Sequence, residues 1–417
     1  MKNSKLITET YSLPFLLFIV LLPLGCNSIH QPELKEGVWR GVFTANDFDI
    51  PFNFNVERNK KTVNVDLING NEKVRVDSIR VERDSVIIPV DVYDTYLIAK
   101  IKGDSLNGFL RRGSATKGTP FYAVHNQSFR FNELSSQPDI EVSGKWSVNL
   151  INQKAETRHT IGLFSQRGSE VTGTILTTTG DFRYLQGIVD GDSIKLSSFG
   201  GSSPSLLRAR RVENNRLEGE YLSPTGKTIF EAVRNDTVEL PDPYTLTYLK
   251  DGYDKFSFSF PDLTGKQVSL ADEKYKDKVV VVTIMGSWCP NCLDEAEFLA
   301  PWYQQNRHRG VEIIALSFER KDDLDFARER LSKFIKRFDV QYDVLFAGPA
   351  DKVVAGEKLP SLSAVLSFPT TIIIDRKGKV RKIHTGFYGP ATGAYYDEFI
   401  KQFNEQIDLL TNEIDAV

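Results

Sequence analysis

Apolar and polar positions alternate in short runs along the first half of the chain. From about residue 37 to residue 236, runs such as 52–56 and 74–76 are separated by turn residues, and no long helical period interrupts them. Strands at such spacing are typical of an antiparallel barrel or sandwich. The pattern therefore predicts a β-rich N-terminal region.

This region contains an internal repeat. Segments 37–40, 83–86 and 105–110 resemble segments 144–147, 191–194 and 216–221, at offsets of 107, 108 and 111 residues. Offsets that drift by a few residues indicate two diverged copies with loop changes. We expect two small antiparallel units, residues 37–134 and 140–236, joined near residues 134–138.

Beyond about residue 244 the pattern changes. Residues 279–285 form a continuous apolar run rich in β-branched side chains, which is typical of a central parallel strand covered on both faces. Apolar positions then recur at helical spacing, at Cys292, Ala296, Leu299, Ala300 and Tyr303. The pattern predicts an α/β domain over residues 244–417 in which a helix follows this strand at once.

The N-terminus and the net charge bear on location. The formal charge of −3 indicates neither nucleic acid nor an acidic surface as a partner. Residues 1–25 combine a short basic end with an apolar run, which is typical of a secretory signal peptide. Cys26 follows directly, and we expect it to carry the lipid that anchors the mature protein in the cell envelope, on the periplasmic or outer-membrane side. Ordinary secretion with an unmodified cysteine is the alternative.

Cys289 and Cys292, the other two of the three cysteines, stand three positions apart. A structural zinc site needs four ligands, and the chain has no second cysteine pair. A haem attachment site needs a histidine where the chain has Leu293. A structural disulfide across so short a loop contributes little stability. A redox-active dithiol remains, with no metal or other cofactor.

The position of this dithiol assigns a role to each thiol. Cys289 is expected at or just before the first turn of the helix, where unpaired N–H groups and the helix dipole stabilise a thiolate. Cys289 is therefore the predicted nucleophile. Cys292, nearly one turn further, is expected to be shielded and to act as the resolving thiol.

The residues around the dithiol resemble the TlpA and ResA group of extracytoplasmic thiol–disulfide oxidoreductases, which have the thioredoxin fold. The resemblance covers residues 244–417, through Pro-Asp-Leu at 261–263, Gly-Lys at 265–266, Trp-Cys-x-x-Cys at 288–292 and the Phe-Pro-Thr strand at 368–375. It implies further strands at 311–317 and 380–384 and a last helix over about 392–410.

The same resemblance implies site residues besides the cysteines. Pro369 takes the place of a cis-proline that faces the dithiol and leaves the preceding backbone free to pair with an extended substrate. Glu295 takes the place of a glutamate that accepts or relays the proton of the resolving thiol. A solvated carboxylate near the helix N-terminus is the alternative for Glu295. The residues expected to bind substrate are Trp288, Pro290, Phe368 and Pro369.

Two further segments have no chemistry of their own. Residues 172–187 resemble a segment found in front of redoxin domains in Bacteroidetes-type lipoproteins, and we expect a spacer or docking platform there. Residues 346–366 are longer than a thioredoxin connection needs, and we expect an inserted loop near the cis-proline.

Together these features predict an enzyme that reduces protein disulfides and receives electrons from a thiol donor in the membrane or periplasm. One alternative is a thiol peroxidase, which is disfavoured because Cys289 lacks the proline and threonine that precede a peroxidatic cysteine. The other alternative is an envelope-binding protein whose redox domain is accessory.

Overall fold

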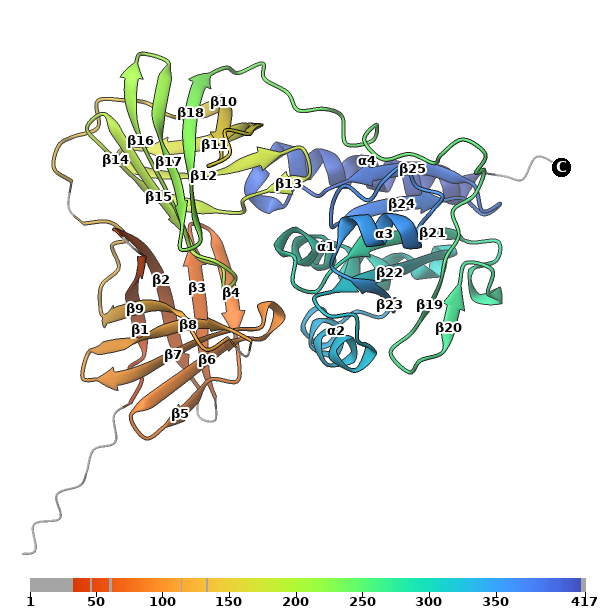
Figure 1. The fold of residues 1–417 in the computed structure, drawn as a ribbon, viewed down its shortest axis with the longest axis horizontal. Helices are drawn as coiled ribbons and strands as arrows, with labels where there is room; N and C mark the ends of the chain where they lie inside the picture. The colour runs from red at the N-terminus through yellow and green to blue at the C-terminus, as the bar shows by residue number, and fades with distance from the viewer. Residues whose placement is uncertain (1–32, 46, 60–61, 114, 133, 414–417) are drawn as a thin grey trace, which may run out of the picture. The chain divides into compact units, whose positions relative to one another are not determined.

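The computed structural model describes residues 33–413 except 46, 60–61, 114 and 133. Pro32–Val417 form one compact unit that contains three large sheets (Figure 1). The predicted signal peptide, residues 1–25, and the predicted lipid site, Cys26, lie outside the described residues.

The first sheet is antiparallel throughout, in the order β4-β3-β2-β1-β9-β8-β7-β6-β5. Its core side chains, such as Trp39, Phe43 and Phe52, are fully buried; Phe43 stacks on Phe52, and both Phe52 and Trp39 stack on Phe54. Its strands are β1 (Gly37–Ala45), β2 (Phe48–Arg58), β3 (Val63–Asn69), β4 (Glu72–Val76), β5 (Arg80–Glu82), β6 (Ser85–Val90), β7 (Thr95–Lys102), β8 (Ser105–Arg112) and β9 (Thr119–His125).

The second sheet closes on itself. Its order is β11-β10-β18-β17-β16-β15-β14-β12-β13, and β11 also pairs with β12, so that eight of its described strands form a barrel with β13 attached to β12. The strands are β10 (Gly144–Ile151), β11 (Thr157–Arg167), β12 (Glu170–Thr177), β13 (Gly180–Asp181), β14 (Leu185–Asp190), β15 (Ser193–Ser198), β16 (Ser205–Glu213), β17 (Arg216–Ser223) and β18 (Gly226–Arg234). The predicted barrel is confirmed here, whereas the first sheet has the same strand order with its seam left open between β4 and β5.

Equivalent contacts in the two sheets confirm the internal repeat. The indole Nε1 of Trp39 donates to the carbonyl oxygen of Lys35 at 3.0 Å, and that of Trp146 donates to Val142 at 2.8 Å. The glycine two residues before each tryptophan has a positive φ, 111° at Gly37 and 114° at Gly144. The strands of the two sheets fall within 37–134 and 140–236, although their division into separate domains stays a prediction.

The third sheet has the thioredoxin-like order β23-β22-β21-β24-β25, with β21 to β23 parallel and β24 and β25 antiparallel. Every residue of the predicted central strand, β21, is buried, as its apolar run requires. A short hairpin precedes this sheet. The strands are β19 (Ser259–Pro261), β20 (Gln267–Ser269), β21 (Val279–Met285), β22 (Val311–Glu319), β23 (Asp343–Pro349), β24 (Thr370–Ile374) and β25 (Val380–Thr385).

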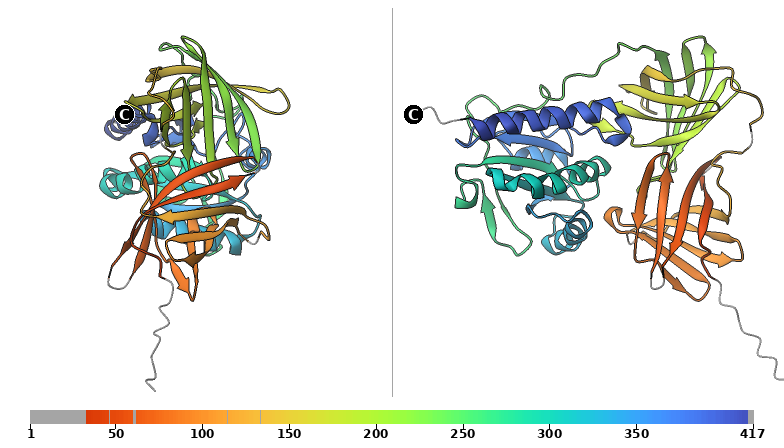
Figure 2. Two further views of the ribbon diagram at one scale, coloured as in Figure 1. Left: turned by 90° about the vertical axis from the view of Figure 1, so that its left-hand side faces the viewer. Right: turned by 180° about the vertical axis from the view of Figure 1, so that it is seen from behind.

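Helices flank this sheet. They are α1 (Pro290–Asn306), α2 (Leu324–Phe338), α3 (Lys352–Lys358) and α4 (Ala394–Asn412), with 3₁₀ turns η1 (Asp91–Tyr93), η2 (Glu273–Tyr275), η3 (Arg307–Arg309) and η4 (Pro390–Thr392). The rings of Phe298 and Trp302 on α1 pack edge-to-face on Phe403 of α4. The two helices therefore cover one face of the sheet together, and they are drawn in teal and dark blue in Figure 2.

The expectation of an inserted loop at residues 346–366 is wrong for its first part. Residues 343–349 form β23, which pairs in parallel with β22, and residues 352–358 form α3. The run Val344-Leu345-Phe346-Ala347 is buried in the sheet. The sequence did not predict β23 because its last two residues, Gly348 and Pro349, are both typical of turns.

Close strand packing in the barrel predicts a strong effect of substituting Gly219. A Cβ atom there would lie 2.5 Å from the Cα of Ala209 and against the carbonyl oxygen of Arg208, both on the backbone of β16. We expect Gly219→Ala to lower the free energy of unfolding by about 1–3 kcal/mol. Chemical denaturation measures this loss. Gly226→Ala is the matched control, because a Cβ at Gly226 meets no atom within 4 Å. Equal stability of the two variants would contradict the close approach.

Candidate redox site

Cys289 lies at the junction between β21 and α1. It is the residue before the first helical residue, Pro290, and only 6% of its surface is exposed. Its Sγ donates to the carbonyl oxygen of Phe368 at 3.2 Å, and the Phe368–Pro369 peptide bond is cis, as expected. The structure thus brings the predicted nucleophile and the predicted cis-proline together, and both Cys289 and Cys292 are free thiols.

Cys292 lies deeper than Cys289. It is 1% exposed, and burial raises the pKa of its thiol well above the ordinary value, with a further increase from the hydrogen bond to Cys289. The thiol form of Cys292 is therefore favoured at neutral pH. The burial agrees with the predicted shielding of Cys292, and the roles of nucleophile and resolving thiol stay predictions.

Trp288 and Phe368 form an aromatic rim beside Cys289. The indole Nε1 of Trp288 donates to the carbonyl oxygen of Phe318 at 2.9 Å, and its ring packs edge-to-face on Phe368 with the centroids 5.8 Å apart. The guanidinium of Arg320 lies 5.6 Å from the centre of the indole ring. These contacts fix the orientation of the indole, so that the rim is rigid.

Glu295 is buried rather than solvated, so the alternative of a solvated carboxylate is wrong. It is 2% exposed and accepts hydrogen bonds from the hydroxyls of Thr283 and Thr371, on β21 and β24. Burial raises its pKa to about 7, although both hydrogen bonds act in the opposite direction. Glu295 and the thiol of Cys292 also interact electrostatically. A carboxyl group with this pKa can take up and release a proton near neutral pH.

Glu319 is a site residue that the sequence did not indicate. It ends β22, and its carboxylate accepts from the backbone N–H and the hydroxyl of Ser287, both at 2.9 Å. The hydroxyl of Ser317 donates to the same carboxylate at 2.7 Å. Burial raises the pKa of Glu319, and these hydrogen bonds oppose the increase. Glu319 therefore holds the turn that leads into Trp288 and Cys289.

The barrel also contacts the dithiol motif. Asn291, between the two cysteines, donates from Nδ2 to the carboxylate of Asp181 on β13 at 2.9 Å. The carbonyl oxygen of Pro290 lies 3.5 Å from Nη1 of Arg183. Both barrel residues belong to segment 172–187, which the sequence marked only as a spacer or docking platform. No local signal reveals such contacts, because they join positions more than a hundred residues apart.

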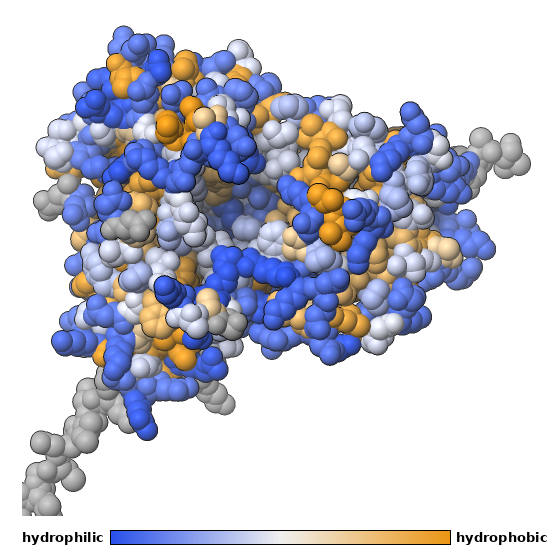
Figure 3. Space-filling model, viewed as in Figure 1, coloured by the Kyte–Doolittle hydropathy of each residue, from blue (hydrophilic) through white to orange (hydrophobic). Residues whose placement is uncertain are grey.

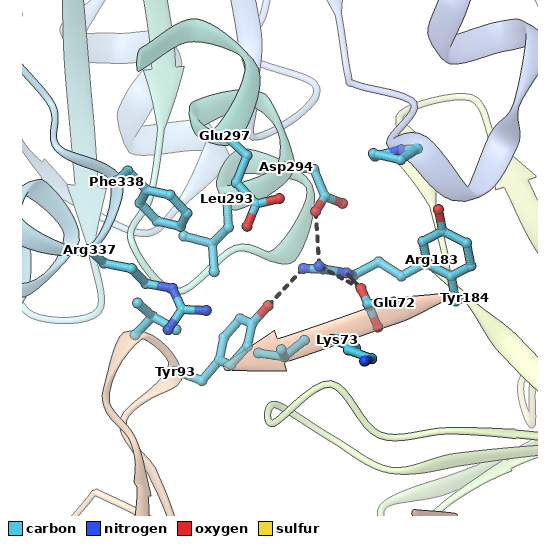
Figure 4. Close-up of a pocket in the computed structure, with 13 residues that line it drawn as sticks. Glu72, Lys73, Tyr93, Arg183, Tyr184, Leu293, Asp294, Glu297, Arg337 and Phe338 are labelled. Atoms are coloured by element: carbon cyan, nitrogen blue, oxygen red, sulfur yellow. Dashed lines mark hydrogen bonds and ion pairs between the residues drawn. The ribbon is translucent and has the colours of Figure 1, made fainter. Parts of the chain in front are cut away.

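Arg183 is the centre of a buried ion-pair cluster that lines a cavity of about 190 Å³ (Figure 4). Its Nη2 lies 2.9 Å from Asp294 on α1 and 2.7 Å from Glu72 on β4. Its Nη1 donates to the hydroxyl of Tyr93 at 3.0 Å. Burial raises the pKa of Asp294, and Arg183 opposes that increase. One guanidinium thus connects both N-terminal sheets to the helix that carries the dithiol.

No group of three or more potential metal ligands occurs within the part of the chain that the structure describes. Within the same residues, none of the helices is both long enough and apolar enough to span a bilayer.

Comparisons with known proteins concern the C-terminal part of the chain. Residues 253–383 match the model of the AhpC/TSA family. The chain is 32% identical over 146 residues to the thiol-disulfide oxidoreductase ResA of Bacillus thuringiensis subsp. konkukian (strain 97-27), covering 35% of this chain and 74% of that protein. It is 28% identical over 138 residues to ResA of Bacillus subtilis (strain 168), covering 33% and 69%.

Two solved structures are also similar. A thiol:disulfide interchange protein of the thioredoxin family from Chlorobium tepidum TLS is 20% identical, with a TM-score of 0.29, and the match covers 39% of this chain and all of that one. A thiol-disulfide oxidoreductase from Bacteroides fragilis NCTC 9343 is 19% identical, with a TM-score of 0.27, and the match covers 35% and 99%.

The raised pKa of Glu295 predicts a pH-dependent stability. Because the folded-state pKa of about 7 lies above the ordinary value of 4.5, the folded state binds the proton more tightly. Stability should therefore fall as pH rises from about 4.5 to about 7, by on the order of 3 kcal/mol. Glu295→Gln should remove this fall in denaturation experiments at pH 5 and pH 8. Glu297→Gln, exposed on the same helix, should keep it. An unchanged pH profile in Glu295→Gln would contradict the assignment.

The cluster around Arg183 predicts a large loss of stability when its cation is removed. Arg183→Gln leaves Asp294 and Glu72 buried without their common partner, which should cost about 3–5 kcal/mol in the free energy of unfolding. Arg208→Gln is the control, because its pair with Glu220 lies on the surface and should contribute about 1 kcal/mol or less. Urea denaturation of both variants measures the difference. Similar losses would show that the Arg183 cluster is no more important than a surface pair.

Proposed function

The chain belongs to the ResA family of thiol-disulfide oxidoreductases, and we propose that it reduces protein disulfides outside the cytoplasm through Cys289 and Cys292. The observation that carries this proposal is the contact between the Sγ of Cys289 and the carbonyl oxygen of Phe368, next to cis-Pro369. It puts the outer thiol of a C-x-x-C pair against the backbone with which an extended client can pair.

The exchange proceeds in two steps. The thiolate of Cys289 attacks one sulfur of the client disulfide, that S–S bond breaks, and the other client sulfur leaves as a thiolate that takes up a proton. Cys292 then loses its proton and attacks the Sγ of Cys289 in the mixed disulfide. The second client thiol is released, and a Cys289–Cys292 disulfide remains. The client gains two electrons and two protons, and an external thiol donor restores the dithiol.

Glu295 is suited to the second step. Its carboxyl group has a pKa of about 7, raised by burial, and it interacts electrostatically with the Cys292 thiol. We assign to it the uptake of the proton that Cys292 releases, which lowers the cost of forming a buried thiolate. Thr283 and Thr371 hold the carboxyl group in place for this transfer.

The surface near the dithiol suits a protein client. Trp288, Phe368 and cis-Pro369 form its rigid part, and Pro290 begins the helix behind it. Exposed apolar side chains occur on the neighbouring segment, with Val353 on α3 70% exposed and Leu366 39% exposed. Figure 3 shows a hydrophobic patch where α3 lies in Figure 1. Such patches are typical of surfaces that bind other proteins.

The location completes the proposal. The apolar N-terminal run, followed by Cys26, fits export and lipid attachment to the cell envelope. A lipid anchor would keep the redox site near a membrane-bound or periplasmic thiol donor. Mass spectrometry of the mature N-terminus tests whether Cys26 carries acyl groups.

Insulin reduction with dithiothreitol as the electron donor tests the activity. The wild-type protein should accelerate the precipitation of the insulin B chain, and Cys289→Ser should return the rate to that of dithiothreitol alone, because the attacking thiol is lost. Cys292→Ala should still attack but should accumulate a mixed disulfide at Cys289, detectable by mass spectrometry.

The same protein tested with hydrogen peroxide provides the contrast. Turnover of peroxide without reduction of insulin would favour a thiol peroxidase. Activity that survives Cys289→Ser would exclude the proposed mechanism altogether.

A further inference from the structure

Segment 177–184 of the barrel, here called the cover segment, lies against the loops that surround the dithiol. The hydroxyl of Ser367, two residues before cis-Pro369, donates to the carbonyl oxygen of Thr179 at 3.0 Å. The hydroxyl of Tyr388 donates to the carbonyl oxygen of Thr177 at 3.1 Å. A Cβ at Gly386 would lie 2.6 Å from the carbonyl carbon of Thr179, so the two backbones are in direct contact.

Asp181 fastens the cover segment to the motif itself. Its Oδ1 accepts from Nδ2 of Asn291 and from the backbone N–H of Gly389, both at 2.9 Å. Its Oδ2 accepts from the backbone N–H of Arg183 at 2.8 Å, which fixes the carboxylate within its own segment. Asp181 is 6% exposed, so these hydrogen bonds are shielded from water.

A small apolar cluster supports the same contact. Ile161 and Leu176 of the barrel are fully buried and pack with Tyr388, which follows β25. The cover segment therefore has an apolar base at one end and the Arg183 ion pairs at the other. It is held at both ends rather than resting loosely on the surface.

The contacts fall on three places: the residue between the cysteines, the cis-proline loop, and the loop after β25, where the backbone N–H of Gly386 donates to the carbonyl oxygen of Pro369 at 2.9 Å. An extended client that pairs with the cis-proline loop needs space beside these three places. The backbone of the cover segment already contacts two of these places, through the carbonyl oxygens of Thr179 and Thr177. A small disulfide needs only the Sγ of Cys289, whereas a protein disulfide brings a polypeptide with it.

We propose that the cover segment is a built-in specificity filter, which rests on the proposed function and which a protein client must displace before its disulfide reaches Cys289. The β-rich region is then part of the redox site, neither a spacer nor the main functional domain. Clients are limited to those that gain enough from binding to offset the lost contacts of Asp181 and Tyr388.

The test compares a protein disulfide with a small one. The mature protein and its Asp181→Ala variant are assayed with insulin and with 2-hydroxyethyl disulfide, and the ratio of the two rates is measured. Loss of the two hydrogen bonds that join Asp181 to Asn291 and Gly389 should raise the ratio of the insulin rate to the 2-hydroxyethyl disulfide rate about fivefold to thirtyfold. Tyr388→Phe removes one hydrogen bond without a change of charge, and it should raise the ratio by a smaller factor.

Asp190→Ala is the matched control. Asp190 is also a barrel aspartate with several hydrogen bonds, but its partners are Ser135, Ser136 and Lys195. Its substitution should leave the ratio as in the wild type. Hydrogen exchange of amides 177–184 reports whether the cover segment has loosened. If Asp181→Ala fails to fold, the ratio of the two rates in Tyr388→Phe serves as the test.

An unchanged or lowered ratio in a variant whose amides 177–184 exchange faster would overturn the filter. A lowered ratio would mean that clients use the segment as a binding wall. A wild-type protein inactive toward both insulin and 2-hydroxyethyl disulfide would instead overturn the proposed function, so the two failures are distinguishable.

Discussion

The position of the dithiol helix depends on the buried guanidinium of Arg183. One cation contacts Glu72 and Asp294, whose side chains are 8% and 4% exposed. Removing charges from water is expensive, and the cost is recovered only when each charge has well-placed partners. Arg183 has two carboxylates, the Tyr93 hydroxyl and the Pro290 carbonyl around it. The first turn of α1 is therefore fixed by the N-terminal region as well as by its own sheet.

Buried carboxylates recur around the cysteines, and each has a different task. Asp294 forms ion pairs, Glu319 accepts hydrogen bonds that hold a turn, and Asp181 joins two parts of the chain. Glu295 accepts hydrogen bonds from two threonine hydroxyls, and burial raises its pKa to about 7. The environment, rather than the residue type, distinguishes the proposed proton acceptor from the other three carboxylates.

Much of the redox region follows from local pattern. The apolar run at residues 279–285 and the helical spacing after it place Cys289 at the start of α1, whereas Pro369 was identified through the family resemblance. Strand β23 was missed because its last two residues are typical of turns. The contacts of Asp181 and Arg183 could not be predicted, because hydrogen bonds between positions more than a hundred residues apart leave no periodic trace in the sequence. Glu319 was not identified either, because its partners Ser287 and Ser317 do not form a recognisable sequence motif with it.

Both copies of the duplicated β-rich region contribute residues to the contacts with the redox domain. Strand β4 pairs with β3 through Asn69 and Glu72, and β13 pairs with β12 through Thr177 and Gly180, each 108 positions further along. The first copy supplies Glu72. The second copy has Gly180 at the equivalent position and supplies Asp181 and Arg183, which follow it closely. Arg183 of the second copy thus contacts the dithiol helix directly, and Glu72 of the first copy pairs with Arg183. A single β unit would therefore supply only part of the buried charge cluster that positions α1.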